Sequence, residues 1–243
     1  MQNTVKLLFF MSVWKRPEIT EICFMGLNRL KKSGVPMEFF AVVSEPSMID
    51  LCEKYGVGWC MTANSPLGAK KNFGLSQAMK RDFDYMIELG SDDLLKNEFL
   101  SLYNYDRDVM ALSDFVMLNT ANGECQRLTR HHAYFGAGRA ISRKALESLN
   151  AHGMYSLWTD SLNRGLDNQS TFFLARRGYM EKRVSSEKPL MVGLKSEVNI
   201  WPYDNTVGAE YSLDDALNGL SEEEINAIRC LVTKNKSADL IGA

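Results

Sequence analysis

The sequence lacks the features that mark secreted, membrane-spanning and zinc-clustered proteins. Its five cysteines show no CxxC spacing, so we expect reduced thiols in a cytosolic protein rather than a disulfide framework or a zinc site. No apolar run approaches the ~18 residues that cross a bilayer. Residues 1–18 lack a signal-peptide layout, because their apolar run ends in a basic turn without a cleavage site. These absences predict a cytoplasmic location (the host cytoplasm for a viral protein) and no transmembrane segment.

The chain also lacks a surplus of charge of either sign. Its 243 residues carry a net charge of -2, with a pI near 6.0, which argues against a generally basic nucleic-acid-binding protein but allows a local basic stripe. The composition is 45% hydrophobic and 24% charged, which is ordinary for a globular protein with its own core. Histidine is scarce: the three are His131, His132 and His152, and none falls late in the chain.

Strand-like and helix-like segments alternate through the first part of the chain. Apolar runs of strand length lie at 5–13, 39–43, 57–61 and 85–89, and helical patterns fill the intervals between them. This alternation predicts an α/β fold with a mostly parallel sheet flanked by helices. Ser221 and Glu224 form a capping-box pattern that predicts the start of a C-terminal helix.

The segment 66–93 combines an expected anion site with an expected cation site. Lys70 and Lys71 lie in the first turn of the predicted helix, where the helix dipole is already positive. Free amides and two ammonium groups suit a bound phosphate there. The alternative is that Lys70 and Lys71 lie on a solvent-exposed face of the helix without a ligand. The next strand ends at Asp92 and Asp93, and adjacent acids at the carboxyl end of a strand favour a divalent cation.

Two short motifs in this segment carry a family resemblance. The run Lys71-Asn72-Phe73-Gly74 and the run Gly90-Ser91-Asp92-Asp93 resemble the GT-A glycosyltransferases, in particular the large inverting family that uses nucleotide sugars. The resemblance implies Mn²⁺ or Mg²⁺ on Asp92, the last acid of the family motif, with Asp93 beside it. The first acid of that motif is replaced by Gly90, which removes its contact with the sugar or ribose.

A second acidic segment, residues 164–179, resembles the family's catalytic helix. Asp167 matches the second acid of a Gly-Glu-Asp-like motif, and Leu166 replaces the first. In inverting members this acid is the general base, which a carboxylate suits if it reaches the acceptor hydroxyl. The alternative role for Asp167 is a plain helix N-cap. Asp160 is the runner-up base, with Trp158 beside it as a sugar platform.

The remaining candidate contacts follow partly from the resemblance and partly from their position in the chain. Trp14 and Arg16 follow the first strand, where the family binds the base and phosphates, and Lys195 and Trp201 lie in a late loop that we interpret as a lid. The expected nucleotide-sugar contacts are Trp14, Arg16, Glu45, Lys70, Lys71, Asn72, Ser91, Lys195 and Trp201. The expected acceptor contacts are Trp158, Arg130, His131 and Arg176.

These observations predict one GT-A-like unit that transfers a sugar from a nucleotide diphosphate donor to an acceptor hydroxyl. Residues 1–95 form its nucleotide half, 96–206 its acceptor half and 207–243 a C-terminal helical tail. Inversion is the preferred outcome. A hydroxymethylated pyrimidine in DNA, a saccharide and a protein side chain remain as acceptors. There are two rival functions. The first is nucleotidyl transfer, which typically uses a Gly-rich basic signature directly after the first strand, and this sequence has no such signature there. The second is that of a degenerate domain that only binds a sugar nucleotide.

Overall fold

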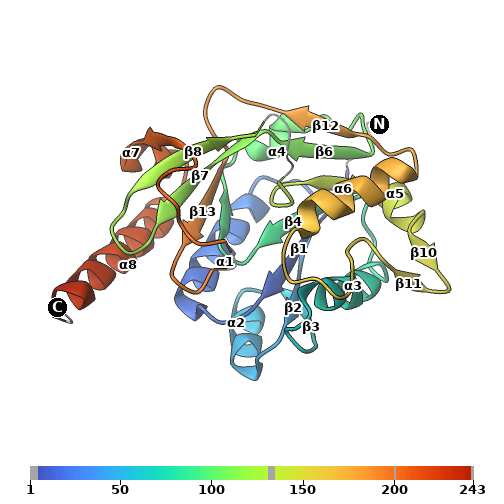
Figure 1. The fold of residues 1–243 in the computed structure, drawn as a ribbon, viewed down its shortest axis with the longest axis horizontal. Helices are drawn as coiled ribbons and strands as arrows, with labels where there is room; N and C mark the ends of the chain where they lie inside the picture. Colours follow the sequence, from blue (N-terminus) through green and yellow to red (C-terminus); the bar gives the residue numbers. More distant parts are fainter. Residues whose placement is uncertain (1–4, 131–134, 200, 242–243) are drawn as a thin grey trace.

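A seven-stranded sheet forms the centre of the structure (Figure 1), a computed structural model that describes residues 5–130, 135–199 and 201–241. The strand order is β12-β6-β9-β4-β1-β2-β3, and every pairing is parallel except those of β9 with β4 and β6. The strands are β1 (Leu7–Val13), β2 (Met37–Val43), β3 (Gly58–Met61), β4 (Tyr85–Gly90), β6 (Val109–Leu112), β9 (Ala140–Ser142) and β12 (Glu181–Val184). The predicted α/β fold with a mostly parallel sheet is confirmed.

Helices cover both faces of this sheet, because alternate side chains of its central strands point to opposite sides. Leu7 and Phe9 pack in one apolar cluster, and Leu8 and Phe10 pack in another. The first face carries α1 (Pro17–Lys31), a 3-10 turn η1 (Pro46–Met48), α2 (Ile49–Lys54) and α4 (Phe99–Leu102). The second carries α3 (Leu67–Ala78), α5 (Arg143–Glu147) and α6 (Leu166–Arg176). Burial on both faces explains why β1 reads as a continuous apolar run.

A second, five-stranded sheet lies beside the first and has the order β14-β8-β7-β13-β5. Its strands are β5 (Asp93–Leu95), β7 (Asp114–Asn119), β8 (Cys125–Thr129), β13 (Met191–Lys195) and β14 (Ala209–Tyr211), and a separate hairpin joins β10 (Asn150–Ala151) to β11 (Met154–Tyr155). Only Ser91 and Asp92 separate β4 from β5. The chain therefore crosses from one sheet to the other at the predicted acidic motif.

The C-terminal part of the chain folds against the second sheet. Helices α7 (Leu213–Leu217) and α8 (Glu222–Ile241) share an apolar cluster with α1 and with strands β5, β7 and β13. The predicted capping box is present: Ser221 N donates to Glu224 Oε2 at 2.9 Å, and Glu224 N donates to Ser221 Oγ at 3.3 Å. Glu224 also pairs with Arg29 of α1 at 2.6 Å, which fixes the helical tail to the core.

Each of the two sheets contains strands from both sides of the expected boundary near residue 95. Strands β6, β9 and β12 belong to the large sheet although they follow that boundary, and β5 precedes it in the smaller sheet. The division into 1–95, 96–206 and 207–243 stays a prediction. No helix among the described residues is long and apolar enough to span a membrane.

Helix α3 packs unusually close to its neighbours at two glycines. A Cβ on Gly74 would lie 1.9 Å from Val42 Cγ2 of β2, and a Cβ on Gly68 would lie 1.9 Å from the Thr159 carbonyl oxygen. Neither side chain nor backbone can give way by that much without a shift of the helix. The glycine of the Lys-Asn-Phe-Gly run therefore holds α3 against the sheet.

We expect Gly74→Ala to lower the free energy of unfolding by about 1–3 kcal/mol, the usual cost of forcing an extra methyl group into a packed core. Urea denaturation measures it. Phe73→Ala, at an exposed neighbouring position on the same helix, should change stability by no more than about 0.5 kcal/mol. Equal stability of Gly74→Ala and the wild type would show that α3 can move away from β2 without loss.

Candidate active site

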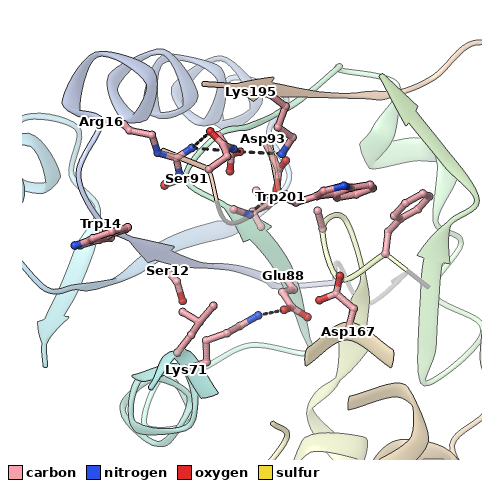
Figure 2. Close-up of a pocket in the computed structure, with 18 of the residues that line it drawn as sticks. Ser12, Trp14, Arg16, Lys71, Glu88, Ser91, Asp93, Asp167, Lys195 and Trp201 are labelled. Carbon is pink, nitrogen blue, oxygen red and sulfur yellow. Dashed lines mark hydrogen bonds and ion pairs between the residues drawn. The ribbon is translucent and has the colours of Figure 1, made fainter. Parts of the chain in front are cut away.

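A pocket of about 230 Å³, here called the central pocket, opens at the carboxyl ends of β1 and β4. Trp14 and Arg16 line it from the loop after β1, and Lys71 lines it from α3. Asp92 lines it from the corner between the sheets, and Asp167 from the first turn of α6. Figure 2 shows two charged groups facing this space: Arg16, Asp93 and Lys195 at one end, and Lys71, Glu88 and Asp167 at the other. This is the edge at which open α/β sheets bind their ligands.

A second cavity of about 480 Å³, the side groove, adjoins the central pocket. The two cavities share Leu67, Lys71, Asp167 and Trp201 in their walls. The side groove adds two further cations, Arg130 and Arg164. Asp167 therefore lies where the two cavities meet and can contact a molecule in either of them.

Asp92 is held by a set of cationic and amide donors. Its Oδ2 atom accepts hydrogen bonds from Lys195 Nζ at 2.9 Å and from Asn199 Nδ2 at 2.5 Å. Arg16 NH1 lies 3.5 Å from the same oxygen and donates to Asn199 Oδ1 at 2.6 Å. Arg16 NH2 also donates to Ser91 Oγ at 3.3 Å. The segment after β13 is thereby fastened to the corner between β4 and β5.

The two adjacent acids differ in their ionisation. Burial opposes the charge of Asp92, but Lys195 and Arg16 outweigh it and hold its pKa below the ordinary value. Burial and the neighbouring charge of Asp92 raise the pKa of Asp93 to about 6, although Gly90 N donates a 2.6 Å hydrogen bond to it. The Lys195 ammonium keeps a raised pKa despite its burial, because Asp92 and Asp93 face it. The corner thus holds one firmly ionised carboxylate.

The residues around Asp92 do not fit a divalent cation as they stand. Within the described part of the chain, no three His, Cys, Asp or Glu side chains are grouped so that they could hold a metal ion. The Asp92 carboxylate already faces Lys195 and Arg16. At an effective dielectric constant of 20, unit charges 4 Å apart repel by about 4 kcal/mol, and a divalent ion doubles that repulsion from each cation. A cation at Asp92 is therefore repelled by both of these side chains.

Glu88 of β4 carries a buried charge at the other end of the pocket. It pairs with Lys71 Nζ and, at 2.8 Å, with Arg139 NH2. Burial alone would raise the pKa of Glu88, but the charges of Lys71 and Arg139 and their hydrogen bonds lower it to about 2. The Lys71 ammonium also lies 4.2 Å from the centre of the Trp158 ring. Lys71 is therefore fixed at the boundary between the two cavities.

Arg139 connects this carboxylate to the helix that carries Asp167. Its fully buried guanidinium donates to Ser170 Oγ at 2.6 Å, to Thr171 Oγ1 at 2.8 Å and to the Asp167 carbonyl oxygen at 3.3 Å. A Cβ on Gly136 would lie 2.4 Å from Asp167 Oδ1 and 3.1 Å from Glu88 Oε1, so both carboxylates face a position that has room only for glycine. These bonds fix the first turn of α6, and hence Asp167, against β4.

No family model matches the sequence, and no curated protein matches it. Solved structures do. The inositol-1-phosphate CTP transferase from T. maritima is 14% identical over 95% of this chain and 98% of that chain, with a TM-score of 0.51. TarS 1–349 from S. aureus is 12% identical over 96% and 72%, with a TM-score of 0.53. The mannosyltransferase PcManGT from Pyrobaculum calidifontis, in complex with GDP-Man and Mn²⁺, is 11% identical over 98% and 76%, with a TM-score of 0.53.

The chain has the GT-A fold. Its structural neighbours include glycosyltransferases and nucleotidyltransferases, and at these identities the likeness is one of fold. The structure brings most of the predicted residues of this GT-A unit to the central pocket. They are Trp14, Arg16, Lys70, Lys71, Ser91, Asp92, Asp93, Asp167, Lys195 and Trp201.

Three residues of the predicted site, two substrate contacts and the runner-up base, lie instead in the framework of the GT-A unit. Asn72 uses its amide on the segment after β11: Nδ2 donates to Trp158 O at 2.6 Å and Asp160 Oδ1 at 2.7 Å, and Oδ1 accepts from Leu157 N at 3.0 Å. Trp158 is 1% exposed and stacks on Phe10. Its indole is therefore a core side chain and not a sugar platform. Asp160 accepts the hydrogen bond from Asn72 and lines neither cavity.

The other predicted contacts are divided between the cavities and the surface. Glu45 accepts a 3.1 Å hydrogen bond from Lys15 N and lies outside both cavities, as does Arg176, which covers the Phe172 ring. Arg130 lines the side groove and stacks on Trp201 at 4.7 Å. Lys70 is buried and donates to Val13 O at 2.7 Å, and burial lowers its pKa to about 8. His131 lies outside the described residues.

Glu88 and Arg139 are absent from the sequence-based site. We interpreted the strand at 85–89 from its apolar residues alone. The signal that marks Glu88 is a lone charge inside an otherwise apolar, buried strand, because a buried charge requires a partner. No sequence feature names that partner.

Glu88→Gln tests the buried ion pairs through their pH dependence. The folded-state pKa of Glu88 is about 2 against an ordinary 4.5, so its stabilisation, on the order of 3 kcal/mol, is fully present above pH 4.5 and is lost as the pH falls towards 2. We expect Glu88→Gln to be less stable than the wild type at pH 7 and to lack this part of the acid-induced loss.

Chemical denaturation between pH 7 and pH 2.5 makes the comparison. Glu38→Gln removes an exposed carboxylate that pairs with Arg81 and should leave the pH profile close to that of the wild type. If Glu88→Gln keeps the full wild-type loss of stability in acid, other carboxylates are responsible for it.

Proposed function

We propose that this protein transfers a sugar from a nucleotide diphosphate donor to an acceptor hydroxyl, with inversion at the anomeric carbon. The observation that carries the proposal is the place of Asp167 at the junction of the central pocket and the side groove. A general base must lie within hydrogen-bond reach of the acceptor while the donor occupies the neighbouring site. The GT-A fold of the chain supports the same reaction class.

The charges along the central pocket support one orientation of the donor. Arg16 and Lys195 lie at the end near the corner between the sheets and suit the diphosphate. Trp14 lines the same pocket from the loop after β1 and suits the base. The sugar then extends towards Asp167 and Lys71, at the boundary with the side groove. In this arrangement the leaving diphosphate and the general base Asp167 lie on different walls of the pocket. Attack on the anomeric carbon from the face opposite the leaving group requires such a separation.

The reaction follows from that placement. The acceptor oxygen attacks the anomeric carbon, and its proton passes to the Asp167 carboxylate. The bond between the anomeric carbon and the diphosphate oxygen breaks, and its electron pair leaves with the nucleoside diphosphate. Lys71, held by Glu88, lies beside the developing charges and fixes the wall against which the sugar rests.

The predicted Mn²⁺ or Mg²⁺ on Asp92 and Asp93 is a separate question. The mannosyltransferase neighbour is described in complex with GDP-Man and Mn²⁺, which supports a metal in this fold. Here Lys195 and Arg16 already face the Asp92 carboxylate. The transfer proposed here therefore uses the protein's own side chains.

The side groove supports an acceptor that carries negative charge. Lys71, Arg130 and Arg164 lie in its wall beside Trp201, whose ring offers a flat apolar surface. DNA with a hydroxymethylated pyrimidine combines phosphates, a planar base and a primary hydroxyl, and is the acceptor that fits this groove best. Saccharides and protein side chains are the alternatives.

Nucleotidyl transfer is the second candidate, because the structural match to the CTP transferase extends over 98% of that chain. The two reactions release different products: sugar transfer releases a nucleoside diphosphate, whereas nucleotidyl transfer from a nucleoside triphosphate releases pyrophosphate. Chromatography of the products separates them. A domain that only binds the donor would release neither.

We expect Asp167→Asn to lower the transfer rate by about 10²–10⁴-fold, the usual contribution of a general base, with donor affinity unchanged. The amide has nearly the shape of the carboxylate but cannot take the proton. Steady-state transfer and calorimetry with the donor measure the two quantities.

Asp160→Asn is the matched control, since Asp160 lies nearby in the sequence but lines neither cavity. It should retain transfer, and the new amide oxygen can still accept from Asn72. If Asp167→Asn transfers at a near-normal rate, Asp167 is not the base, and loss in Asp160→Asn alone would move the role there.

Mass spectrometry of a panel of nucleotide sugars against DNA with and without hydroxymethylpyrimidine tests the acceptor. We expect addition of one hexose or pentose only to the hydroxymethylated DNA, with a rate that falls as salt rises because phosphates contact the basic groove. Transfer to oligosaccharides with no salt dependence would contradict the DNA assignment and leave the reaction class intact.

A further inference from the structure

We propose that Arg16 and Lys195 take the place of the divalent cation, so that the protein binds nucleotide diphosphates, and releases them after transfer, without metal. The inference rests on the proposed function, because it concerns the diphosphate end of the same pocket. It assigns these two side chains as the groups that neutralise the leaving group.

The first support is the state of the expected metal ligand. Three groups converge on Asp92 Oδ2: Lys195 Nζ and Asn199 Nδ2 donate hydrogen bonds at 2.9 Å and 2.5 Å, and Arg16 NH1 forms an ion pair at 3.5 Å. Two of the three carry a full positive charge, so the carboxylate serves as their shared counter-ion. Lys195 and Asp92 are each only 7% exposed, which limits the screening of these charges by water.

The second support is the shortage of oxygen ligands. Hard cations such as Mg²⁺ and Mn²⁺ take several oxygens, and the GT-A motif of this chain has lost its first acid to Gly90. Asp93 turns one oxygen to the Gly90 N–H at 2.6 Å. Among the described residues, no further carboxylate or histidine completes a set of three. A single carboxylate that already has two cationic partners is a poor cation site.

The third support is backbone strain that directs Arg16 into the pocket. Lys15 and Arg16 have φ values of 55° and 53°, in the left-handed region that ordinary residues rarely adopt. Such conformations cost free energy and persist only where the surroundings enforce them. Here Pro17 begins α1 directly afterwards, and the Arg16 side chain is held by Ser91 and Asn199. The strained turn positions a guanidinium at the diphosphate end.

Both side chains keep donors for a ligand. An ammonium has three N–H bonds and a guanidinium has five, so their bonds to Asp92, Ser91 and Asn199 leave further donors for phosphate oxygens. When the bond to the anomeric carbon breaks, the electron pair stays on the diphosphate oxygen. Arg16 and Lys195 stabilise that new negative charge electrostatically, without a proton transfer. A metal ion at this position would stabilise it in the same way.

The direction in which one substitution changes the affinity for nucleoside diphosphates distinguishes the two roles of Asp92. If Asp92 is a counter-ion for Arg16 and Lys195, Asp92→Asn removes a negative charge beside the diphosphate, and the affinity for nucleoside diphosphates is retained or increases severalfold. If Asp92 is a metal ligand, the same change weakens binding. Titration calorimetry with UDP, GDP, CDP and ADP, each in EDTA and again in Mn²⁺, measures both conditions.

For the wild type we expect Kd values within about twofold in EDTA and in Mn²⁺, with saturable binding of at least one nucleotide. Lys195→Gln should weaken that nucleotide by about tenfold or more, the effect of losing one charge-assisted hydrogen bond, and leave the matching nucleoside unchanged. Arg16→Gln should act in the same direction. Lys182→Gln, which removes an exposed lysine paired with Asp106, is the control and should bind as the wild type does.

The outcomes separate this inference from the proposed function. Binding that requires Mn²⁺, together with weaker binding by Asp92→Asn, overturns the metal-free assignment and leaves sugar transfer standing. If none of the four nucleotides binds in either condition, the proposed function fails and this inference fails with it. Circular dichroism of each variant distinguishes loss of the site from loss of the fold.

Discussion

The active-site geometry depends on the ion pairs formed by the buried carboxylate of Glu88. It lies inside the central sheet, where an unpaired charge would be prohibitively costly, so it requires Lys71 on one side and Arg139 on the other. Lys71 belongs to α3, and Arg139 reaches the first turn of α6. One charge in β4 thereby fixes two helices on the same face of the sheet. The wall between the central pocket and the side groove is built from these helices together with Trp201.

The opposite end of the pocket depends on a topological constraint. The chain leaves the large sheet at Gly90 and enters the small one at Asp93, so Ser91 and Asp92 lie at the corner between the two sheets. Strand β13 pairs with β5 at this corner, which brings Lys195 beside Asp92. The same corner receives Arg16 from the loop after β1. Two groups of paired charges therefore face each other across one pocket, with Arg16 and Lys195 beside Asp92 at one end and Lys71 beside Glu88 at the other.

Much of the fold followed from local pattern. The apolar runs gave the parallel strands, and the capping box at Ser221 gave the start of α8, because both signals depend on residues close together in the chain. The roles of individual motif residues were harder to predict. Asn72 and Gly74 match the family run, yet Asn72 binds the backbone around Trp158 and Gly74 admits Val42. A motif shows which residue types occur together and does not show which of them face the ligand.

The sequence by itself determined the alternation of strands and helices as far as β4, the place of Asp92 and Asp93 at the end of a buried strand, and the place of Asp167 in the first turn of a helix. Only the tertiary structure decided which charges meet. Lys195 and Asp92 are 103 positions apart, and Arg139 and Glu88 are 51 apart, so nothing in local spacing pairs them. Ion pairing and burial depend on distance in space. Both sheets and the helices between them had to be in place before a predicted metal ligand could be seen to face two cations.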